Sequence, residues 1–218
     1  DNAAATCFYR ITVRDQDPKK VGRAFSSAAV ETALSSIPGF FGLTPPGAGS
    51  EYPVYWPALV PADVVGHEVH FEGSVTAIAH PDGSASVIDG DEPWARTAIH
   101  REWGETEWAP LGSVLGARSG DKGPNANLGV FTRDDEAFWW MLDFLTVDRL
   151  VELLPDLAGL PITRHEYPQL RAVNFVIGLL LEEGVGASTR VDAQAKGLSE
   201  YLRSRHTEIP ARLLEASS

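Results

Sequence analysis

Residues 116–131 constrain the fold of this chain more than any other stretch. The first fourteen of them contain four glycines, one proline and two asparagines, with three charged side chains and one serine between them. Residues of these types often adopt a positive φ, and their backbone N–H groups are often not hydrogen-bonded within a β-sheet. Both properties favour a loop that holds an anion or lets a ligand approach closely. The alternative is a long hairpin turn, because glycine-rich stretches often serve geometry alone.

The spacing within this stretch excludes two familiar catalytic loops. A Walker phosphate loop places lysine directly after its last glycine, whereas here Lys122 precedes Gly123. A nucleophile elbow has glycine two positions before and after its serine, whereas Ser119 has Ala117 and Asp121 at those positions. Any chemistry of Ser119 or Lys122 therefore belongs to neither motif.

The overall composition predicts a folded protein that binds neither nucleic acid nor anionic membranes. The chain has 218 residues, 44% of them hydrophobic, which is enough to bury a full core in one large or two small domains. A formal net charge of -12 at pH 7 disfavours both kinds of partner. A single cysteine, Cys7, excludes an intramolecular disulfide framework and favours a reducing compartment. Since no apolar run is long enough to span a bilayer, we expect a soluble cytoplasmic protein.

The first half of the chain is expected to contain few regular elements. The patterns predict a strand at 6–13, a helix at 22–36, a loop at 40–61, a β-hairpin with strands at 69–79 and 85–88, and a linker at 89–110. The loop aromatics Tyr52, Tyr55 and Trp56 are expected to be buried, because isolated aromatics usually pin a proline-rich loop to the core.

His67 and His70 match a zinc motif only in part. The zincin helix has two residues between its glutamate and its second histidine, whereas one residue separates Glu68 from His70. In a strand, His67 and His70 point to opposite faces. Because the chain has no cluster of cysteine or histidine ligands and no dinucleotide fingerprint, we expect no bound metal and no redox cofactor.

The second half of the chain carries stronger periodic signals. Apolar residues at i, i+3, i+4 and i+7 predict helices at 134–145 and 146–154, with the stripe Phe138, Trp139 and Trp140 in the core. A strand is predicted at 162–167. The apolar run 170–181 fits a buried strand or a buried helix, and its length favours the helix.

Asp192 is a candidate cap for a last helix. It lies one turn before Lys196, and a surface ion pair between the two is the simplest expectation. Leu198, Tyr201 and Leu202 would then face the core.

Three segments of the chain resemble the acyclic terpene utilisation proteins of AtuA type. They are Ala117-Arg118-Ser119-Gly120-Asp121-Lys122-Gly123 with Asn125-Ala126-Asn127-Leu128-Gly129-Val130, then Leu170-Arg171-Ala172-Val173-Asn174-Phe175, and last Arg190-Val191-Asp192-Ala193-Gln194-Ala195-Lys196. The resemblance implies an α+β protein in which residues 109–218 are a ferredoxin-like α/β sandwich. Residues 1–108 would be a smaller β-rich remnant of the family's main domain with one helix.

The resemblance also implies a partner. Family members are about twice as long, so this chain looks like a C-terminal piece or one subunit of a split version. The missing N-terminal domain or a partner subunit would then complete it, in a homo- or hetero-oligomer.

The activity implied by the resemblance is one step in the catabolism of branched isoprenoid compounds as coenzyme A thioesters, of hydratase or lyase type. Asp121 is the expected proton-transfer group, with Lys122 and Ser119 as the other catalytic candidates. Backbone N–H groups of residues 120–127 would stabilise the thioester oxyanion. The expected substrate-binding residues are Arg118, Gly120, Gly123, Asn125, Asn127, Asn174, Arg190, Asp192 and Lys196.

The sequence leaves open how the polar residues of these segments are arranged. The polar residues of the three segments meet either at one site, in a hydrogen-bonded structural network or at a subunit interface. The chain is accordingly either a catalytic or substrate-binding part of an acyl-CoA enzyme, or a non-catalytic assembly module of a larger complex.

Overall fold

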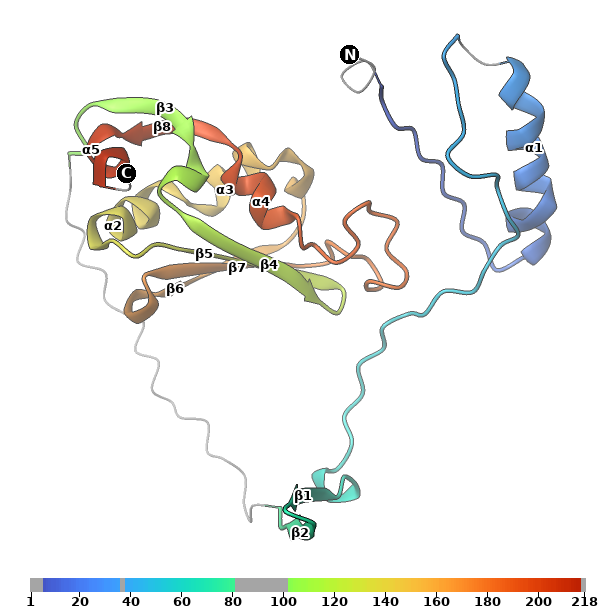
Figure 1. Cartoon of the computed structure of the whole chain (residues 1–218), viewed down its shortest axis with the longest axis horizontal. Helices are drawn as coiled ribbons and strands as arrows, with labels where there is room; N and C mark the ends of the chain where they lie inside the picture. Colours follow the sequence, from blue (N-terminus) through green and yellow to red (C-terminus); the bar gives the residue numbers. More distant parts are fainter. Residues whose placement is uncertain (1–5, 36–37, 81–101, 217–218) are drawn as a thin grey trace.

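The structure is a computed structural model that describes residues 6–35, 38–80 and 102–216. They form an α+β C-terminal part and a sparsely structured N-terminal part (Figure 1). The C-terminal part contains a four-stranded sheet, a two-stranded sheet and four helices. Its strands are β3 (Thr106–Pro110), β4 (Gly116–Lys122), β5 (Asn125–Phe131), β6 (Ile162–Tyr167), β7 (Ala172–Ile177) and β8 (His206–Pro210), and its helices are α2 (Asp135–Phe144), α3 (Val147–Leu153), α4 (Leu198–Arg203) and α5 (Ala211–Ala216).

The four-stranded sheet has the order β4-β5-β7-β6, and all neighbouring strands are antiparallel. Strands β5 and β6 are therefore parallel to one another with β7 between them, and α2 and α3 connect them. This arrangement is the split βαβ unit of ferredoxin-like folds. The expected α+β class is confirmed, and so are the two helices and the strand predicted at 134–154 and 162–167.

The helices cover one face of this sheet, as Figure 1 shows. Alternate residues of β5 and β7 point into the helical layer and are fully buried, among them Leu128, Phe175 and Ile177. Phe138 and Trp140 of α2 are also buried, and Trp139 packs against the same core, as predicted. Helices α2 and α3 each start at a side-chain cap: the Asp134 carboxylate accepts from the N–H of Ala137, and the Thr146 hydroxyl accepts from that of Arg149.

The glycine-rich stretch 116–131 is not a loop. Its residues form the β4–β5 hairpin, which is paired from Gly116↔Phe131 to Lys122↔Asn125 and turns through Gly123 and Pro124. Within the hairpin only Gly123 has a positive φ, of 61°. The expectation of an open loop with free N–H groups at 120–127 is therefore wrong, because β5 pairs with strands on both sides.

The run 170–181 forms a central strand, not the expected helix. Its residues 172–177 are β7, which pairs with β5 and β6, and every second side chain is buried. A strand that is covered on one face and paired on both edges has an apolar composition close to that of a buried helix. Gly184 lies in the following turns with φ +104° rather than at a helix end.

The last helix also begins later than expected. Helix α4 starts at Leu198, and Asp192 instead holds a turn by accepting from the backbone N–H groups of Lys196 and Gly197. Leu198 and Leu202 face the core as predicted, whereas Tyr201 is exposed. Strands β3 and β8 were not expected, and β3 lies within the predicted linker.

The N-terminal part has fewer regular elements than its sequence pattern suggests. Residues 6–13 form no strand, while the helix predicted at 22–36 is present as a short π-helical turn, α1 (Phe25–Thr32) and a 3-10 turn at 33–35. Residues 40–61 are irregular, as predicted. Their aromatics are not buried: Tyr52, Tyr55 and Trp56 are 44%, 53% and 85% exposed, so that prediction is wrong.

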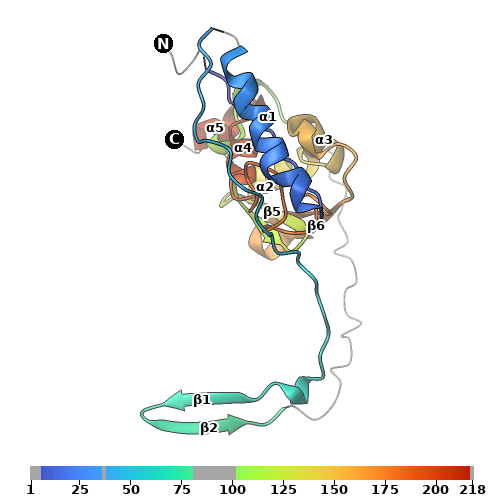
Figure 2. The same ribbon diagram turned by 90° about the vertical axis from the view of Figure 1, so that its right-hand side faces the viewer.

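The stretch predicted as one strand at 69–79 is itself most of a hairpin, so the predicted single strand is wrong. Strands β1 (His67–Phe71) and β2 (Ser74–Ile78) pair around Glu72 and Gly73, whose φ values are 47° and 78°. Two consecutive positive φ values match the twist of a two-residue hairpin, which the prediction of one long strand missed. The proposed second strand at 85–88 lies outside the described residues. Figure 2 shows this hairpin extending away from the other described elements, and all residues of both strands are exposed.

Candidate functional site

The four-stranded sheet of the C-terminal part has one covered face and one open face. The covered face packs on α2, α3 and α4, and the other carries no helix of the described chain (Figure 1). The register fixes which side chains share the open face. These are Gly116, Arg118, Gly120 and Lys122 on β4, Asn125, Asn127, Gly129 and Phe131 on β5, Thr163, His165 and Tyr167 on β6, and Ala172, Asn174 and Val176 on β7.

The open face is basic in a strongly acidic chain. None of its strand positions carries an aspartate or glutamate, whereas Arg118 and Lys122 both lie on it. Lys196, from the loop before α4, adds a third cation. Its Nζ lies 3.2 Å from the position that a Cβ would take on Gly120, so its side chain passes the edge strand β4 and reaches this face.

The centre of the open face is a pair of asparagines. The Asn127 Nδ2 donates to the Asn174 Oδ1 at 3.4 Å. Asn127 is paired in register with Gly120, over which Lys196 lies, and Asn174 is paired with Gly129. Glycine at position 120 leaves room for the Lys196 ammonium group, because a Cβ there would stand 3.2 Å from the Lys196 Nζ. A Cβ on Gly129 would meet the Asn174 Oδ1 at an ordinary contact distance of 3.7 Å. Each of the three sequence segments that share the family resemblance therefore contributes to this surface, the third of them only through Lys196.

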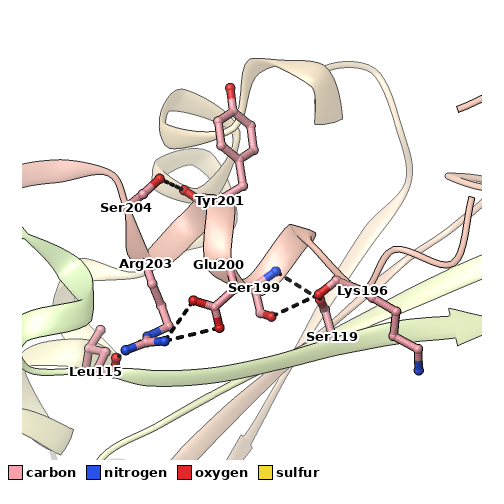
Figure 3. Close-up of polar contacts among 8 residues, drawn as sticks. All are labelled: Leu115, Ser119, Lys196, Ser199, Glu200, Tyr201, Arg203 and Ser204. Atoms are coloured by element: carbon pink, nitrogen blue, oxygen red, sulfur yellow. Dashed lines mark hydrogen bonds and ion pairs between the residues drawn. The ribbon is translucent and has the colours of Figure 1, made fainter. Parts of the chain in front are cut away.

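Ser119 faces the helices. Its Oγ donates to the carbonyl of Ala195 at 2.6 Å. It also accepts from the N–H of Ser199 at 2.9 Å (Figure 3). These two bonds tie the start of α4 to the edge strand β4, and both hydrogen-bonding functions of the hydroxyl are used within the fold. Nearby, Arg203 bonds both the Leu115 carbonyl and the Glu200 carboxylate.

Replacing Ser119 by alanine is expected to lower stability without weakening ligand binding. The substitution removes the acceptor for the Ser199 N–H, which should lower the free energy of unfolding by about 1–2 kcal/mol. Urea denaturation of the full chain measures this loss, and a Gln194→Ala variant at an exposed loop position is the control. Unchanged stability together with lost ligand binding would contradict this role and favour a catalytic Ser119.

The remaining predicted residues divide between the open face and the framework. Asp121 lies on the helix-facing side by alternation, opposite Ala126. The Asn125 Oδ1 accepts from the N–H of Leu179 at 3.0 Å, which fixes the turn after β7. Arg190 lies 3.8 Å from the Asp156 carboxylate, away from the strand positions of the open face.

The proposed catalytic trio is therefore not assembled at one point. Asp121 and Ser119 share the covered face, and Lys122 is at the end of the open face, where its Nζ donates to the Asp121 carbonyl. A catalytic role for these three residues stays a prediction. The binding candidates Arg118, Gly120, Asn127, Asn174 and Lys196 do share the open face or reach it, with Lys122 at its end.

The three open-face residues of β6, Thr163, His165 and Tyr167, were not singled out in the sequence. His165 is opposite Asn174, and Thr163 is opposite Val176, both on strand β6. The alternation of β6 was visible, but its pairing with β7 was not, because residues 170–181 were expected to be helical. Recognising the alternation of residues 172–177 would have predicted a strand there, but its register with β6 comes only from the structure.

Ion pairing shifts the pKa of two carboxyl groups, both away from the open face. A hydrogen bond from Arg171 lowers the pKa of Asp135 at the start of α2, and that of Arg171 is raised by the same contact. A hydrogen bond from Lys20 lowers the pKa of Asp15. Folding lowers the pKa of both carboxyl groups, so each ion pair stabilises the folded state at pH values above the unfolded-state pKa of about 3.9. This stabilisation is lost as the pH falls through the lower pKa values of the folded state.

The described residues contain no group of three or more histidine, cysteine, aspartate or glutamate side chains with the geometry to hold a metal ion. His67 lies near His80 with ring centroids 5.1 Å apart, and His70 pairs with Glu68. Within the same described ranges, no helix is long and apolar enough to cross a membrane.

Comparison with known families identifies both parts of the chain. The model of the AtuA ferredoxin-like domain matches residues 109–208, which include all four strands of the central sheet. The model of the acyclic terpene utilisation family protein AtuA matches residues 1–71. Neither the curated proteins nor the solved structures contain a significant match to the chain. The two family matches show that this chain is an AtuA-like protein with a C-terminal ferredoxin-like domain.

Proposed function

We propose that this chain is the substrate-binding part of an enzyme that acts on branched, isoprenoid coenzyme A thioesters, of hydratase or lyase type. The observation that carries the proposal is the open face of the β4-β5-β7-β6 sheet, whose described strand positions hold cations and amides and no acidic residue. In a chain with a net charge of -12, such a surface is a local exception that suits an anionic ligand.

Coenzyme A offers the groups that this face can bind. Its phosphates would pair with Arg118, Lys122 and Lys196, since guanidinium and ammonium groups make charge-assisted hydrogen bonds to phosphate. The Asn127 and Asn174 amides can donate to and accept from a neutral group such as an amide or thioester carbonyl. No bound redox cofactor is needed for this role.

The acid–base chemistry is assigned to a partner domain or subunit, with this chain holding the thioester. Ser119 is engaged in holding α4, and Asp121 lies on the opposite side of the sheet from the cations. A general acid or base must come within hydrogen-bonding distance of the proton that it moves. The proposed activity is cytoplasmic, a location that the single cysteine of the chain supports.

Calorimetric titration with free coenzyme A and with a prenyl-CoA thioester tests the proposal. We expect saturable binding, weakened roughly tenfold or more in Lys196→Ala, because a hydrogen bond to a charged group contributes about 1.5–3 kcal/mol. Lys19→Ala, an exposed cation of the N-terminal part, is the control. Equal binding by all three proteins would contradict the proposed surface.

A non-catalytic assembly role is the second candidate, and the β1–β2 hairpin favours it. Phe71 and Val75 are 68% and 57% exposed, and a two-stranded hairpin is at best marginally stable without a covering surface. An assembly module would bind its partner through such side chains. If sedimentation shows that Phe71→Asp dissociates an oligomer of the wild-type chain while binding of coenzyme A is absent in both, the assembly role replaces the substrate-binding role.

A further inference from the structure

The turns after β7 receive two segments from the N-terminal part. The Tyr55 N–H donates to the Glu183 carbonyl at 2.9 Å. The Arg14 guanidinium donates to the Glu182 carboxylate at 3.0 Å and to the Ala187 carbonyl at 2.6 Å, and it lies over the Tyr52 ring. Residues more than 120 positions apart thus meet on residues 182–187, which we call the acceptor loop.

Three glycines make room for these segments. A Cβ on Gly123 would stand 2.6 Å from the Tyr55 ring, and one on Gly184 would stand 2.8 Å from the Tyr55 Cβ. A Cβ on Gly186 would stand 2.3 Å from the Pro53 Cγ and 2.9 Å from the Pro53 carbonyl oxygen. Real Cβ atoms do not approach other atoms so closely, so any side chain at these positions would displace the N-terminal segment.

Of the three glycines, Gly186 is the one whose lack of a side chain is explained by the docked segment and not by its own backbone conformation. Gly123 and Gly184 have positive φ values of 61° and 104°, so glycine is favoured there for conformational reasons alone. Gly186 has no positive φ, and its backbone therefore accepts other residues. What a side chain at Gly186 meets is the backbone and ring of Pro53. The space at this position fits the docked segment.

We propose that the acceptor loop, with Gly123, is a docking site for residues 52–56 of the same chain, clamped by Arg14. The occupant is an extended segment with proline and tyrosine, held by one backbone hydrogen bond and by an arginine paired with two glutamates. The two sides of this contact belong to the two matched family segments, 1–71 and 109–208. The site therefore joins the AtuA segment to the ferredoxin-like domain, independently of any ligand on the open face.

The docking site also has a defined position relative to the sheet. Gly123 is the turn of the β4–β5 hairpin, and Lys122 at the end of the open face directly precedes it. Tyr55 lies against that turn. Docking thus brings the N-terminal segment to one end of the basic surface without using the residues at its centre.

Amide hydrogen exchange of the full-length chain tests this proposal through the Tyr55 N–H. In the wild-type chain the bond to Glu183 should slow its exchange. We expect Gly186→Val to speed this exchange by about tenfold or more, while the N–H groups of β5 and β7 keep their protection. Gly47→Val is the matched control, because a Cβ on Gly47 meets nothing within 4 Å.

A charge swap provides a second, independent variant. Arg14→Glu places a carboxylate beside Glu182 and Glu183 and should speed the exchange of the Tyr55 N–H, whereas adding Glu182→Arg should restore part of the protection. Fast exchange of the Tyr55 N–H in the wild-type chain would overturn the proposal. So would unchanged exchange in Gly186→Val, or protection that disappears on dilution, since the segment would then dock on another copy.

Discussion

Replacing Phe175 by alanine is expected to lower the free energy of unfolding of the C-terminal domain by about 3–5 kcal/mol, the largest single effect on its stability. Phe175 lies at the centre of β7 and is fully buried between the sheet and the helices. It is paired with Leu128 on one side and Arg164 on the other, so a smaller side chain leaves a cavity that neither neighbour can fill. The midpoint and slope of urea unfolding measure the loss.

The adjacent residue is the control for this prediction. Val176 is in the same strand but points to the open face and is only half-buried. Val176→Ala removes a β-branched side chain without leaving a cavity in the core. It should therefore lower the free energy of unfolding by only about 1 kcal/mol. Similar losses for the two variants would mean that β7 does not face the helices in the observed register.

Reversing two charges on the open face is expected to abolish measurable coenzyme A binding. Arg118→Glu combined with Lys196→Glu replaces two attractive charges by two repulsive ones on a face whose described strand positions hold no acidic residue. Loss of two charge-assisted hydrogen bonds alone should weaken binding by roughly a hundredfold, and repulsion of the phosphates adds to this loss. Calorimetric titration of the full chain gives the affinity.

A matched variant separates this effect from the change in net charge. Lys19→Glu with Arg23→Glu alters the net charge by the same amount on exposed positions of the N-terminal part. It should retain most of the wild-type affinity, because exposed charges beyond about 10 Å are screened at 0.1 M salt. Equal loss of binding in both double variants would mean that the chain's overall charge, and not the open face, controls the affinity.

The helical layer of the domain was predictable from the sequence because its signals are local. Asp134 and Thr146 are caps next to strongly periodic apolar residues, and both helices start where these caps place them. The sheet was harder to predict because strand pairing is non-local. Residues 172–177 have the composition of a buried helix, and only their pairing with β5 and β6 distinguishes them.

The glycines of the central stretch were misread for a physical reason. Glycine was taken as a sign of unusual backbone conformation, which holds only at Gly123. At Gly116, Gly120 and Gly129 the backbone is that of a strand, and the missing side chains of the first two make room for Phe131 and Lys196. The sequence pattern contains the residues of the open face, but not the pairing that brings them together.

The most direct test of the account is to map coenzyme A onto the full chain by backbone amide chemical shifts. The account predicts that the largest shifts fall on β4, β5 and β7 around Gly120, Asn127 and Asn174, and that they saturate with the calorimetric affinity. Saturable shifts confined to the β3–β8 sheet or to the N-terminal part would contradict it. The complete absence of shifts in the folded chain would likewise show that the open face does not bind this ligand.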